Sequence, residues 1–465
     1  MAIPHCVLSS LNAKQINYEI IEADLPSSIA EQHQQKTTDQ QIAVMVLLET
    51  ADTKLQAIVS STSILNLDAL NDFTGQYVQP VSCKSNQELL VAKGLKTLPA
   101  VPDITIYKTF VDEALLGAKT ILMSSGQQDT LLSLSQNDFA LLIDDCHTMP
   151  LGIAIAGFAQ QNHDRSNDSK DIDNAIRNYT SLQIKKRLSD TLEIPPLSAT
   201  AQKILNLSSD PNADIDQLVK IIELDPSLAA QVVSWAASPY YSAPGKIASI
   251  RDAIVRVLGF ELVMNLALGL AMGQSLTVPK NGACGIALFW RQAIYSALAM
   301  EKINRIVPAS KRGQAGYAYL AGLMNNFGYL ILNHVFPAHF ATLCLYMNAS
   351  PHINPMYIEQ HLLGVTSEQM CSQLAEAWNL PLQINNALRF QQDPLYTDED
   401  ANYANLCFVT TRLLTRMDIG NLPYEDIPAS LYEALELNPD DAENIMLEMQ
   451  TSKDEIEMML SSLAA

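Results

Sequence analysis

Histidine and cysteine, which often act as metal ligands and nucleophiles, are sparse in this sequence and poorly spaced for either role. His334 and His339 stand five residues apart on either side of Pro337, which does not suit a shared helix face. His352 and His361 lie among loop signals, so we expect surface or capping roles for these histidines rather than metal binding. The seven cysteines include no CxxC pair, which predicts reduced thiols in a cytoplasm rather than a disulfide frame.

The common nucleotide-binding and hydrolytic motifs are also missing from the sequence. Its 465 residues contain no GxGxxG, no Walker lysine loop, no HExxH and no nucleophile elbow. The start Met1-Ala2-Ile3-Pro4 lacks the charged-then-apolar order of a signal peptide. The apolar runs near Met149–Ala159 and Leu262–Gly273 are too short to cross a bilayer. We therefore expect a cytoplasmic protein that has no membrane anchor and needs no metal or cofactor.

The charge of the chain is strongly negative and unevenly distributed. Fifty acidic residues against 29 basic ones give a net charge of −21, which disfavours nonspecific attraction to nucleic acid and anionic lipid. The stretch Asp398–Ala465 holds 15 acidic and 3 basic residues, a net charge of −12. Apolar residues still recur there at helical spacing, which predicts acidic amphipathic helices. Their charged face is either simply solvated or a docking surface for a basic partner. The recurring apolar residues are Leu431, Leu435, Ile445, Met446 and Met449.

The length of the chain and its changes in pattern predict several domains. Residues 1–150 contain compact apolar runs of strand length, such as Gln41–Leu48 and Lys54–Ser60, beside a helix candidate at Ala13–Ile20. Residues 151–189 form a predicted linker and connecting helix, in which Gln160–Asp171 has no apolar residue. From residue 190 onward nearly every segment has helical periodicity. The fold class is therefore a multi-domain chain, in which an N-terminal α+β domain with a mixed sheet precedes an all-α domain and acidic C-terminal helices.

Within the all-α part we expect long apolar helices over Phe289–Ile303 and Tyr317–Val335. Ser249 is placed to cap a helix that begins at Ile250. Prolines fall between the periodic segments, as helix boundaries require. We place the helical domain at residues 190–393 and the acidic extension at residues 394–465.

A series of short motifs runs through the helical domain. They are Ile194-Pro-Pro-Leu197, Asp210-Pro211, Ile221–Leu228, Ala237–Tyr241, Ile250–Ile254, Val257–Phe260, Phe289–Gln292, Ala321–Gly328 and Ala377–Pro381. Their content and order resemble the HDOD family, the non-catalytic relatives of HD-type metal phosphohydrolases. The resemblance implies a bacterial signal-transduction or regulatory role that is exerted through binding.

The same resemblance implies which residues stand where HD-type hydrolases hold a divalent metal. These degenerate positions are Gln292, Asn325, Asn326, Ser367, Gln391 and Gln392. Amides and a hydroxyl bring no formal charge to the site and are weak ligands for transition metals. We therefore predict that HD phosphohydrolase activity is lost. The substituted side chains form either a polar network that fixes helix packing or a pocket for a small ligand. A regulatory protein partner and a homo-oligomer are both compatible with this role.

The N-terminal domain carries a second, weaker set of motifs. Val111–Leu115, Ile121–Gly126 and Leu132–Phe139 follow one another, and Lys36 precedes the strand candidate at Gln41–Leu48. Together these segments resemble the YbaK/prolyl-tRNA editing family, whose members deacylate mischarged tRNA. The resemblance implies a YbaK-like fold with Lys36 as the catalytic residue and tRNA as a partner.

One departure from that family concerns its glycine-rich loop. In this sequence the loop is Lys93–Ala100, which has a single glycine, and Leu95 and Leu98 stand where backbone amides should approach the ligand. Aminoacyl-tRNA deacylation is therefore the alternative function. The interpretation that we prefer is that the N-terminal domain has been reused for binding or dimerisation.

Overall fold

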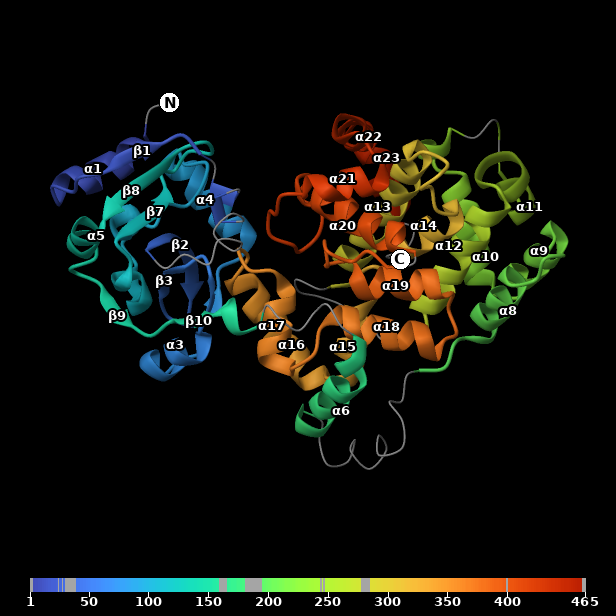
Figure 1. Ribbon diagram of the computed structural model, residues 1–465, viewed down its shortest axis with the longest axis horizontal. Coiled ribbons are helices and arrows are strands. Elements are labelled where there is room, and N and C mark those ends of the chain that lie inside the picture. The colour runs from blue at the N-terminus through green and yellow to red at the C-terminus, as the bar shows by residue number, and fades with distance from the viewer. Residues whose placement is uncertain are drawn as a thin grey trace. The chain divides into compact units, whose positions relative to one another are not determined.

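The computed structural model describes residues 3–23, 25–26, 28–29, 39–158, 165–179, 195–242, 245, 247–276, 285–398 and 400–461. The chain forms two compact units (Figure 1). Unit 1 comprises residues 1–160, 342–361 and 422–426, and unit 2 comprises residues 161–341, 362–421 and 427–465. Neither unit is a continuous stretch of chain, because two later segments join the N-terminal unit.

Unit 1 is built on a mixed sheet of eight strands, with the order β1-β8-β7-β2-β3-β6-β9 and β5 paired to β2. The pairs β2–β7, β3–β6 and β6–β9 are parallel, and the other pairs are antiparallel. The ladder β10–β4 is separate. The strands are β1 (Glu19–Ile21), β2 (Gln40–Glu49), β3 (Lys54–Ser60), β4 (Ser63–Leu65), β5 (Gln79–Pro80), β6 (Lys108–Asp112), β7 (Thr120–Ser124), β8 (Leu131–Ser135), β9 (His147–Met149) and β10 (Gly152–Ala154).

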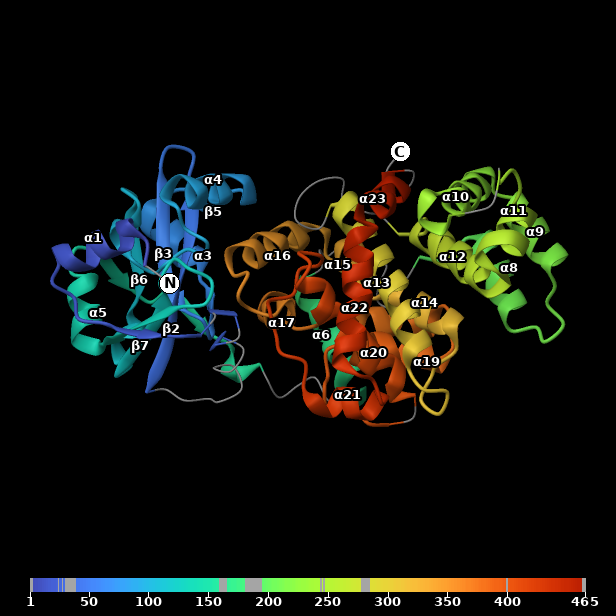
Figure 2. The ribbon, with the colours of Figure 1, turned by 90° about the horizontal axis from the view of Figure 1, so that it is seen from above.

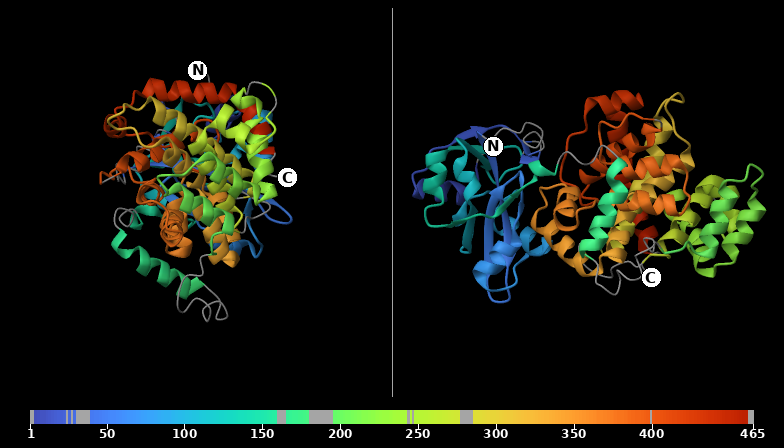
Figure 3. Two further views of the ribbon diagram at one scale, coloured as in Figure 1. Left: turned by 90° about the vertical axis from the view of Figure 1, so that its right-hand side faces the viewer. Right: turned by 60° about the horizontal axis from the view of Figure 1, so that its bottom comes forward.

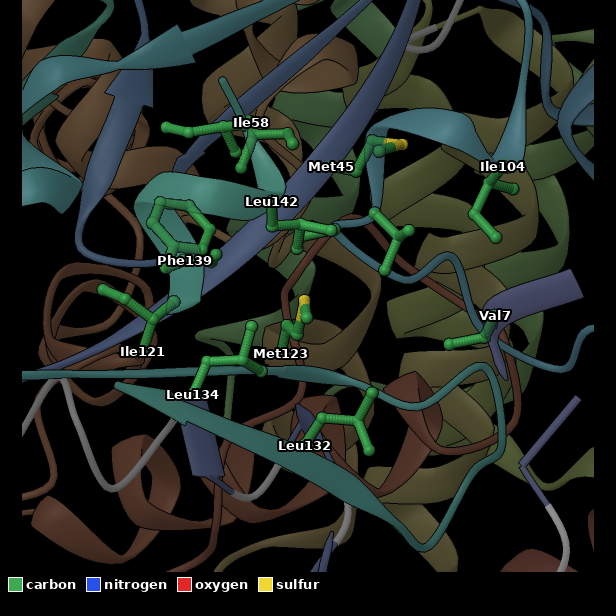
Figure 4. Close-up of a cluster of buried hydrophobic side chains, with 14 of the residues drawn as sticks. Val7, Met45, Ile58, Ile104, Ile121, Met123, Leu132, Leu134, Phe139 and Leu142 are labelled. Atoms are coloured by element: carbon green, nitrogen blue, oxygen red, sulfur yellow. The ribbon is translucent and has the colours of Figure 1, made fainter. Parts of the chain in front are cut away.

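The core of unit 1 lies between the sheet and its helices. Strand β2 is buried from Ile42 to Leu48, as expected for a central strand that is covered on both faces. Val7 of α1, Met45 of β2 and Phe139 of α5 belong to one apolar cluster (Figure 4). The helices are α1 (His5–Ala13), α3 (Leu67–Thr74), α4 (Cys83–Lys93) and α5 (Gln136–Leu142).

The predicted helix over Ala13–Ile20 is wrong. Helix α1 ends at Ala13, and Gln15 then takes a left-handed conformation with φ 58°, which stops the helix. Glu19–Ile21 forms β1, which pairs with β8. The strand forms because backbone pairing with β8 outweighs the weak helical periodicity of this short segment.

Hydrogen bonds explain why residues 342–361 belong to unit 1. The Leu65 amide donates to Ser350 Oγ at 3.0 Å, and the Tyr346 hydroxyl donates to Asp68 Oδ2 at 3.1 Å. Tyr346 lies on α16 (Pro337–Ala349), and Ser350 follows that helix directly, before α17 (Pro355–Leu363). Asn354 Nδ2 donates to Glu425 Oε1 at 3.0 Å, which joins residues 422–426 to the same unit.

Unit 2 is helical throughout its described residues apart from short loops and turns (Figure 2). Ser249 caps α11, as predicted, by accepting a hydrogen bond from the amide of Asp252. Thr366 opens α18 with a reciprocal capping box. The helices are α6 (Asp168–Tyr179), α8 (Ala199–Ser208), α9 (Ile215–Glu223), α10 (Pro226–Ala236), α11 (Ile250–Ala253), α12 (Phe260–Gly273), α13 (Ile286–Ile306), α14 (Ala315–Met324), α15 (Phe327–Val335), α18 (Ser367–Ala377), α19 (Leu382–Phe390), α20 (Ala401–Thr415), α21 (Ala429–Leu435), α22 (Pro439–Thr451) and α23 (Lys453–Ser461).

The acidic C-terminal helices were predicted correctly. Leu431 and Leu435 of α21 are buried, as are Ile445, Met446 and Met449 of α22. Helix α22 packs beside α13 and α20 (Figure 2). Some of the acidic charge is neutralised inside the unit by three ion pairs, which are Arg291–Glu457 at 2.6 Å, Lys302–Glu448 at 3.5 Å and Arg416–Glu443 at 3.0 Å.

Two further expectations about unit 2 need correction. The predicted helix Tyr317–Val335 is two helices, α14 and α15, separated by Asn325 and Asn326. Asp168, in the stretch expected to be an exposed linker, begins α6 and is only 9% exposed. Figure 3 shows α6, in blue-green, along one side of the helical unit. The part of the predicted connecting helix after Tyr179 lies outside the described residues.

Candidate degenerate metal site

The two asparagines between α14 and α15 hold the chain against α13. Asn325 Nδ2 donates to Ser296 Oγ at 2.9 Å, and Asn326 Nδ2 donates to the Phe289 carbonyl oxygen at 2.9 Å. Both asparagines are at least nine-tenths buried. These bonds explain the helix break, because each amide reaches a partner on α13 that an uninterrupted helix would not present. Each side-chain amide therefore donates to a structural contact.

The turn after α19 contacts the Asn325–Asn326 segment between α14 and α15. Gln391 is buried, and its Nε2 donates to the Asn325 carbonyl oxygen at 2.8 Å. Gln392 follows in the chain, and its Oε1 is buried without a hydrogen-bond partner in the described structure. The structure thus brings the predicted positions at Asn325 and Gln391 into direct contact.

The backbone of Ser367, at the start of α18, lies against Gly328 at the start of α15. A methyl group on Gly328 would lie 2.2 Å from the Ser367 carbonyl oxygen, so α15 and α18 touch at this glycine. Gln292 is different, because it is half-buried and lies against Gly420, whose Cβ position would be 3.6 Å from Gln292 Nε2. The contacts therefore join Gln391 to Asn325 and place Ser367 against Gly328, two residues after Asn326, whereas Gln292 lies against Gly420.

The donor set of this site does not fit a transition metal. Asn325 Oδ1 and Asn326 Oδ1 are buried oxygens with no hydrogen-bond partner in the described structure, and both are neutral. Within the described residues, no group of three or more His, Cys, Asp or Glu side chains is placed to hold a metal ion. Neutral amide oxygens cannot offset the desolvation of a divalent ion as imidazole and carboxylate ligands do.

Charged side chains are also buried in the helical unit, and local pattern did not predict them. Burial raises the pKa of Glu368, while the guanidinium groups of Arg389 and Arg412 act in the opposite direction. Arg389 forms a buried ion pair with Asp168. The only signal for Arg389 was one cation in the otherwise uncharged helix α19, and Asp168 was indistinguishable from its polar neighbours.

Leu95, in the loop where the editing resemblance implies ligand contact, packs in the apolar core of unit 1. Leu95 is 5% exposed, and a methyl group on Gly126 would lie 2.6 Å from Leu95 Cδ2. The Lys96 amide donates to the Gly126 carbonyl oxygen at 2.8 Å, which holds this loop on the sheet. Lys36 lies outside the described residues.

Comparison with known proteins identifies the helical unit. The HDOD domain model matches residues 194–394. A crystal structure of a protein from Marinobacter aquaeolei VT8, provisionally described as a signal transduction protein, is 35% identical. That similarity covers 100% of both chains with a TM-score of 0.90. The chain therefore belongs to the HDOD-domain proteins, which confirms the resemblance seen in its motifs.

Two other relatives match smaller parts of the chain. An uncharacterised protein of Treponema pallidum (strain Nichols) is 23% identical over 242 residues, which are 51% of this chain and 45% of that protein. The match thus spans less than half of this curated relative. A structure provisionally described as a trans-editing enzyme for prolyl-tRNA synthetase is 18% identical, with a TM-score of 0.28. It covers 32% of this chain and 95% of that one, and similarity at this level assigns no activity to unit 1.

The described helices also bear on the membrane question. None of the helices in the described ranges is both long enough and apolar enough to cross a bilayer.

Proposed function

We propose that this protein is a non-catalytic bacterial regulator that acts in signal transduction through binding by its HDOD domain. The relative that is similar over the whole chain and is provisionally described as a signal transduction protein supports the regulatory role. The observation that carries the non-catalytic part is the use of the Asn325 and Asn326 amides as donors to Ser296 and Phe289. These side chains hold the segment between α14 and α15 against α13, so they contribute to the packing of the domain.

The chemistry of the site supports the same conclusion. An HD-type hydrolase needs a metal to generate hydroxide and to stabilise phosphoryl charge. Asn325, Asn326 and Gln391 are neutral, and the buried Arg389 is already paired with Asp168. Neutral amide oxygens compensate poorly for the desolvation of a divalent cation.

A hydrolysis assay tests this proposal. We expect the purified full chain with Mn²⁺ to hydrolyse bis(p-nitrophenyl) phosphate no faster than buffer does. Asn326→Ala is the matched control, because it removes one degenerate position and leaves any contaminating enzyme in place. Mn²⁺-dependent turnover in the parent that disappears in Asn326→Ala would overturn the non-catalytic assignment.

The occupant of the domain is proposed to be a protein partner or a small ligand in the cytoplasm. The six described cysteines of the chain form no disulfide with one another, which fits a reducing compartment. Affinity capture from a native lysate, with quantitative mass spectrometry, should recover a stoichiometric partner or a second copy of this chain. Recovery of chaperones alone would contradict a protein partner.

Aminoacyl-tRNA deacylation by unit 1 is the alternative, and the packing of Leu95 on Gly126 disfavours it. The loop Lys93–Ala100, which should present backbone amides to the ligand, instead packs its Leu95 side chain into the apolar core against Gly126. We expect the full chain to leave mischarged tRNA intact. Deacylation by the parent that is lost in Lys36→Ala would reinstate this function.

A further inference from the structure

A carboxylate is bound deep in unit 2 by groups of the HDOD domain. Arg389 Nε donates to Asp168 Oδ2 at 2.6 Å, and Arg389 Nη2 donates to Asp168 Oδ1 at 2.9 Å. Gln369 Nε2 donates to the same Oδ1 at 2.9 Å. The Arg389 side chain is fully buried, whereas that of Asp168 is 12% exposed. Three donors on α18 and α19 therefore enclose a carboxylate whose edge reaches solvent.

Charged side chains of both signs lie around this ion pair, among them Arg165, Asp171 and Glu368. The guanidinium groups of Arg165 and Arg389 each lie 5.2 Å from the centroid of the Phe390 ring. Arg165 Nη2 donates to Asn385 Oδ1 at 2.8 Å, while Arg165 Nε is buried with no hydrogen-bond partner in the described structure. Two guanidinium groups thus share a ring beside Asp168, and one of them has a buried donor without a partner in the described structure.

The bound carboxylate comes from outside the domain that binds it. Asp168 begins α6, which precedes the HDOD match at residues 194–394, whereas Gln369 and Arg389 lie within that match. Helix α6 packs on α18 and buries Ile172 and Ala175. Through Arg389 and Gln369 the HDOD domain therefore holds a carboxylate that a preceding helix supplies.

We propose that Arg389 and Gln369 form a binding site for a small oxyanion, a carboxylate or a phosphate, and that Asp168 occupies this site as an internal ligand. Binding of an external anion releases Asp168 and loosens α6 from α18. This inference rests on the proposed regulatory function and deepens it, because it names the ligand class and the element that responds. A guanidinium fork suits both anions, since it offers two parallel N–H donors.

The release of α6 follows from competition for one set of donors. The parent protein holds Asp168 at a high effective concentration, so an external anion must supply contacts that Asp168 cannot. Removing the Asp168 carboxylate leaves Arg389 buried without its bidentate partner, and an added anion can then take its place. Chemical rescue therefore tests the receptor directly.

The experiment compares Asp168→Ala with the parent in urea unfolding, followed by tryptophan fluorescence. Sodium acetate or phosphate replaces sodium chloride at constant ionic strength. We expect Asp168→Ala to unfold at lower urea and to recover part of the loss saturably. An anion at about ten times its dissociation constant raises the ratio of folded to unfolded protein about tenfold. The stronger of the two anions identifies a carboxylate or a phosphate as the source.

Two controls separate a receptor from a general salt effect. Asp168→Ala combined with Arg389→Met should not respond to either anion, because the fork is gone. Asp171→Ala is the matched control, since Asp171 Oδ2 also lies near Gln369 Nε2, at 3.5 Å. It should behave like the parent, because Arg389 holds the carboxylate of Asp168 and not that of Asp171. If Asp168→Ala fails to fold when chloride is the only anion present, the addition of acetate or phosphate should restore native fluorescence during refolding.

The outcomes decide the proposal in either direction. Equal responses in chloride, acetate and phosphate, or an unchanged response in the double variant, would overturn it. In the parent, hydrogen exchange of residues 168–179 should quicken at saturating acetate or phosphate, and unchanged exchange would overturn the release of α6. A hydrolase could still show anion rescue, so failure of the non-catalytic assignment is distinguishable from failure of this inference.

Discussion

The contact between α15 and α18 at Gly328 makes a sharp prediction for Gly328→Ala. The new methyl carbon would lie 2.2 Å from the carbonyl oxygen and 2.6 Å from the carbonyl carbon of Ser367. Ordinary van der Waals contact begins near 3.4 Å, so about 1.2 Å of separation is needed. These two atoms are backbone, and the third close atom is Ser367 Cβ at 2.7 Å, which no side-chain rotation moves, so the two helices must move apart.

The size of the effect follows from two opposing contributions. Overpacking of a well-packed core typically costs about 1–3 kcal/mol, and an immobile backbone neighbour favours the upper end. Replacing glycine by alanine in a helix returns at most about 1 kcal/mol, and less at Gly328 because it is the second residue of α15. We therefore expect Gly328→Ala to lower the unfolding free energy by about 2–3 kcal/mol.

The measurement is urea unfolding followed by tryptophan fluorescence, which reports on unit 2 alone. All three tryptophans, Trp235, Trp290 and Trp378, lie in unit 2 and are at least nine-tenths buried. With an m-value of about 2–3 kcal/mol/M, the midpoint should fall by about 1 M.

Gly269→Ala is the matched control, because it lies in the interior of α12 and its methyl group meets an equally close neighbour. That neighbour is the Cδ2 methyl of Leu323 at 2.3 Å, the end of a side chain that can rotate away. We expect a change within about 1 kcal/mol. Equal midpoints for the two alanine variants would refute the claim that a backbone contact at Gly328 sets the cost.

Three further predictions concern buried polar groups. Burial raises the pKa of Glu368, so its neutral form is favoured in the native state and ionisation becomes an increasing penalty as pH rises above the unfolded value. Glu368→Gln should therefore gain stability relative to the parent as pH rises above 4.5 in urea titrations, and a pH-independent difference would contradict this. Thr366→Ala breaks the capping box of α18 and should cost about 1–2 kcal/mol by the same assay, whereas Thr366→Ser should retain most of the stability. Burial raises the pKa of Cys407 to about 12 and also raises that of Cys371, so iodoacetamide with mass spectrometry should modify exposed Cys83 first and those two only after unfolding.

Local pattern was enough to predict much of the architecture. The apolar runs at Gln41–Leu48 and Lys54–Ser60 became adjacent central strands, because an apolar run of strand length is stable only where it is covered. The acidic C-terminal segment kept its buried stripe at Leu431 and Met449, since helical periodicity is visible within a few turns. The motifs of the HDOD family likewise placed the helical domain.

The sequence could not show how these elements end or which polar groups meet. Residues 19–21 became a strand because β8 was available to pair with them, and that partner lies more than a hundred residues away. The break at Asn325 depends on acceptors that α13 presents only after the helices have packed. Asp168 and Arg389 are 221 residues apart, and each belongs to a segment whose local pattern has no need of the other.

The amino-acid sequence alone determined the classes of element, the family and the neutral side chains at the degenerate positions, because these depend on residue type and short-range spacing. Only the tertiary structure decided that the amides at Asn325 and Asn326 bind α13 and that Asp168 fills a site made by Arg389 and Gln369. Such pairings bring together groups that are distant in the chain, and their strength depends on burial, which exists only in the folded state.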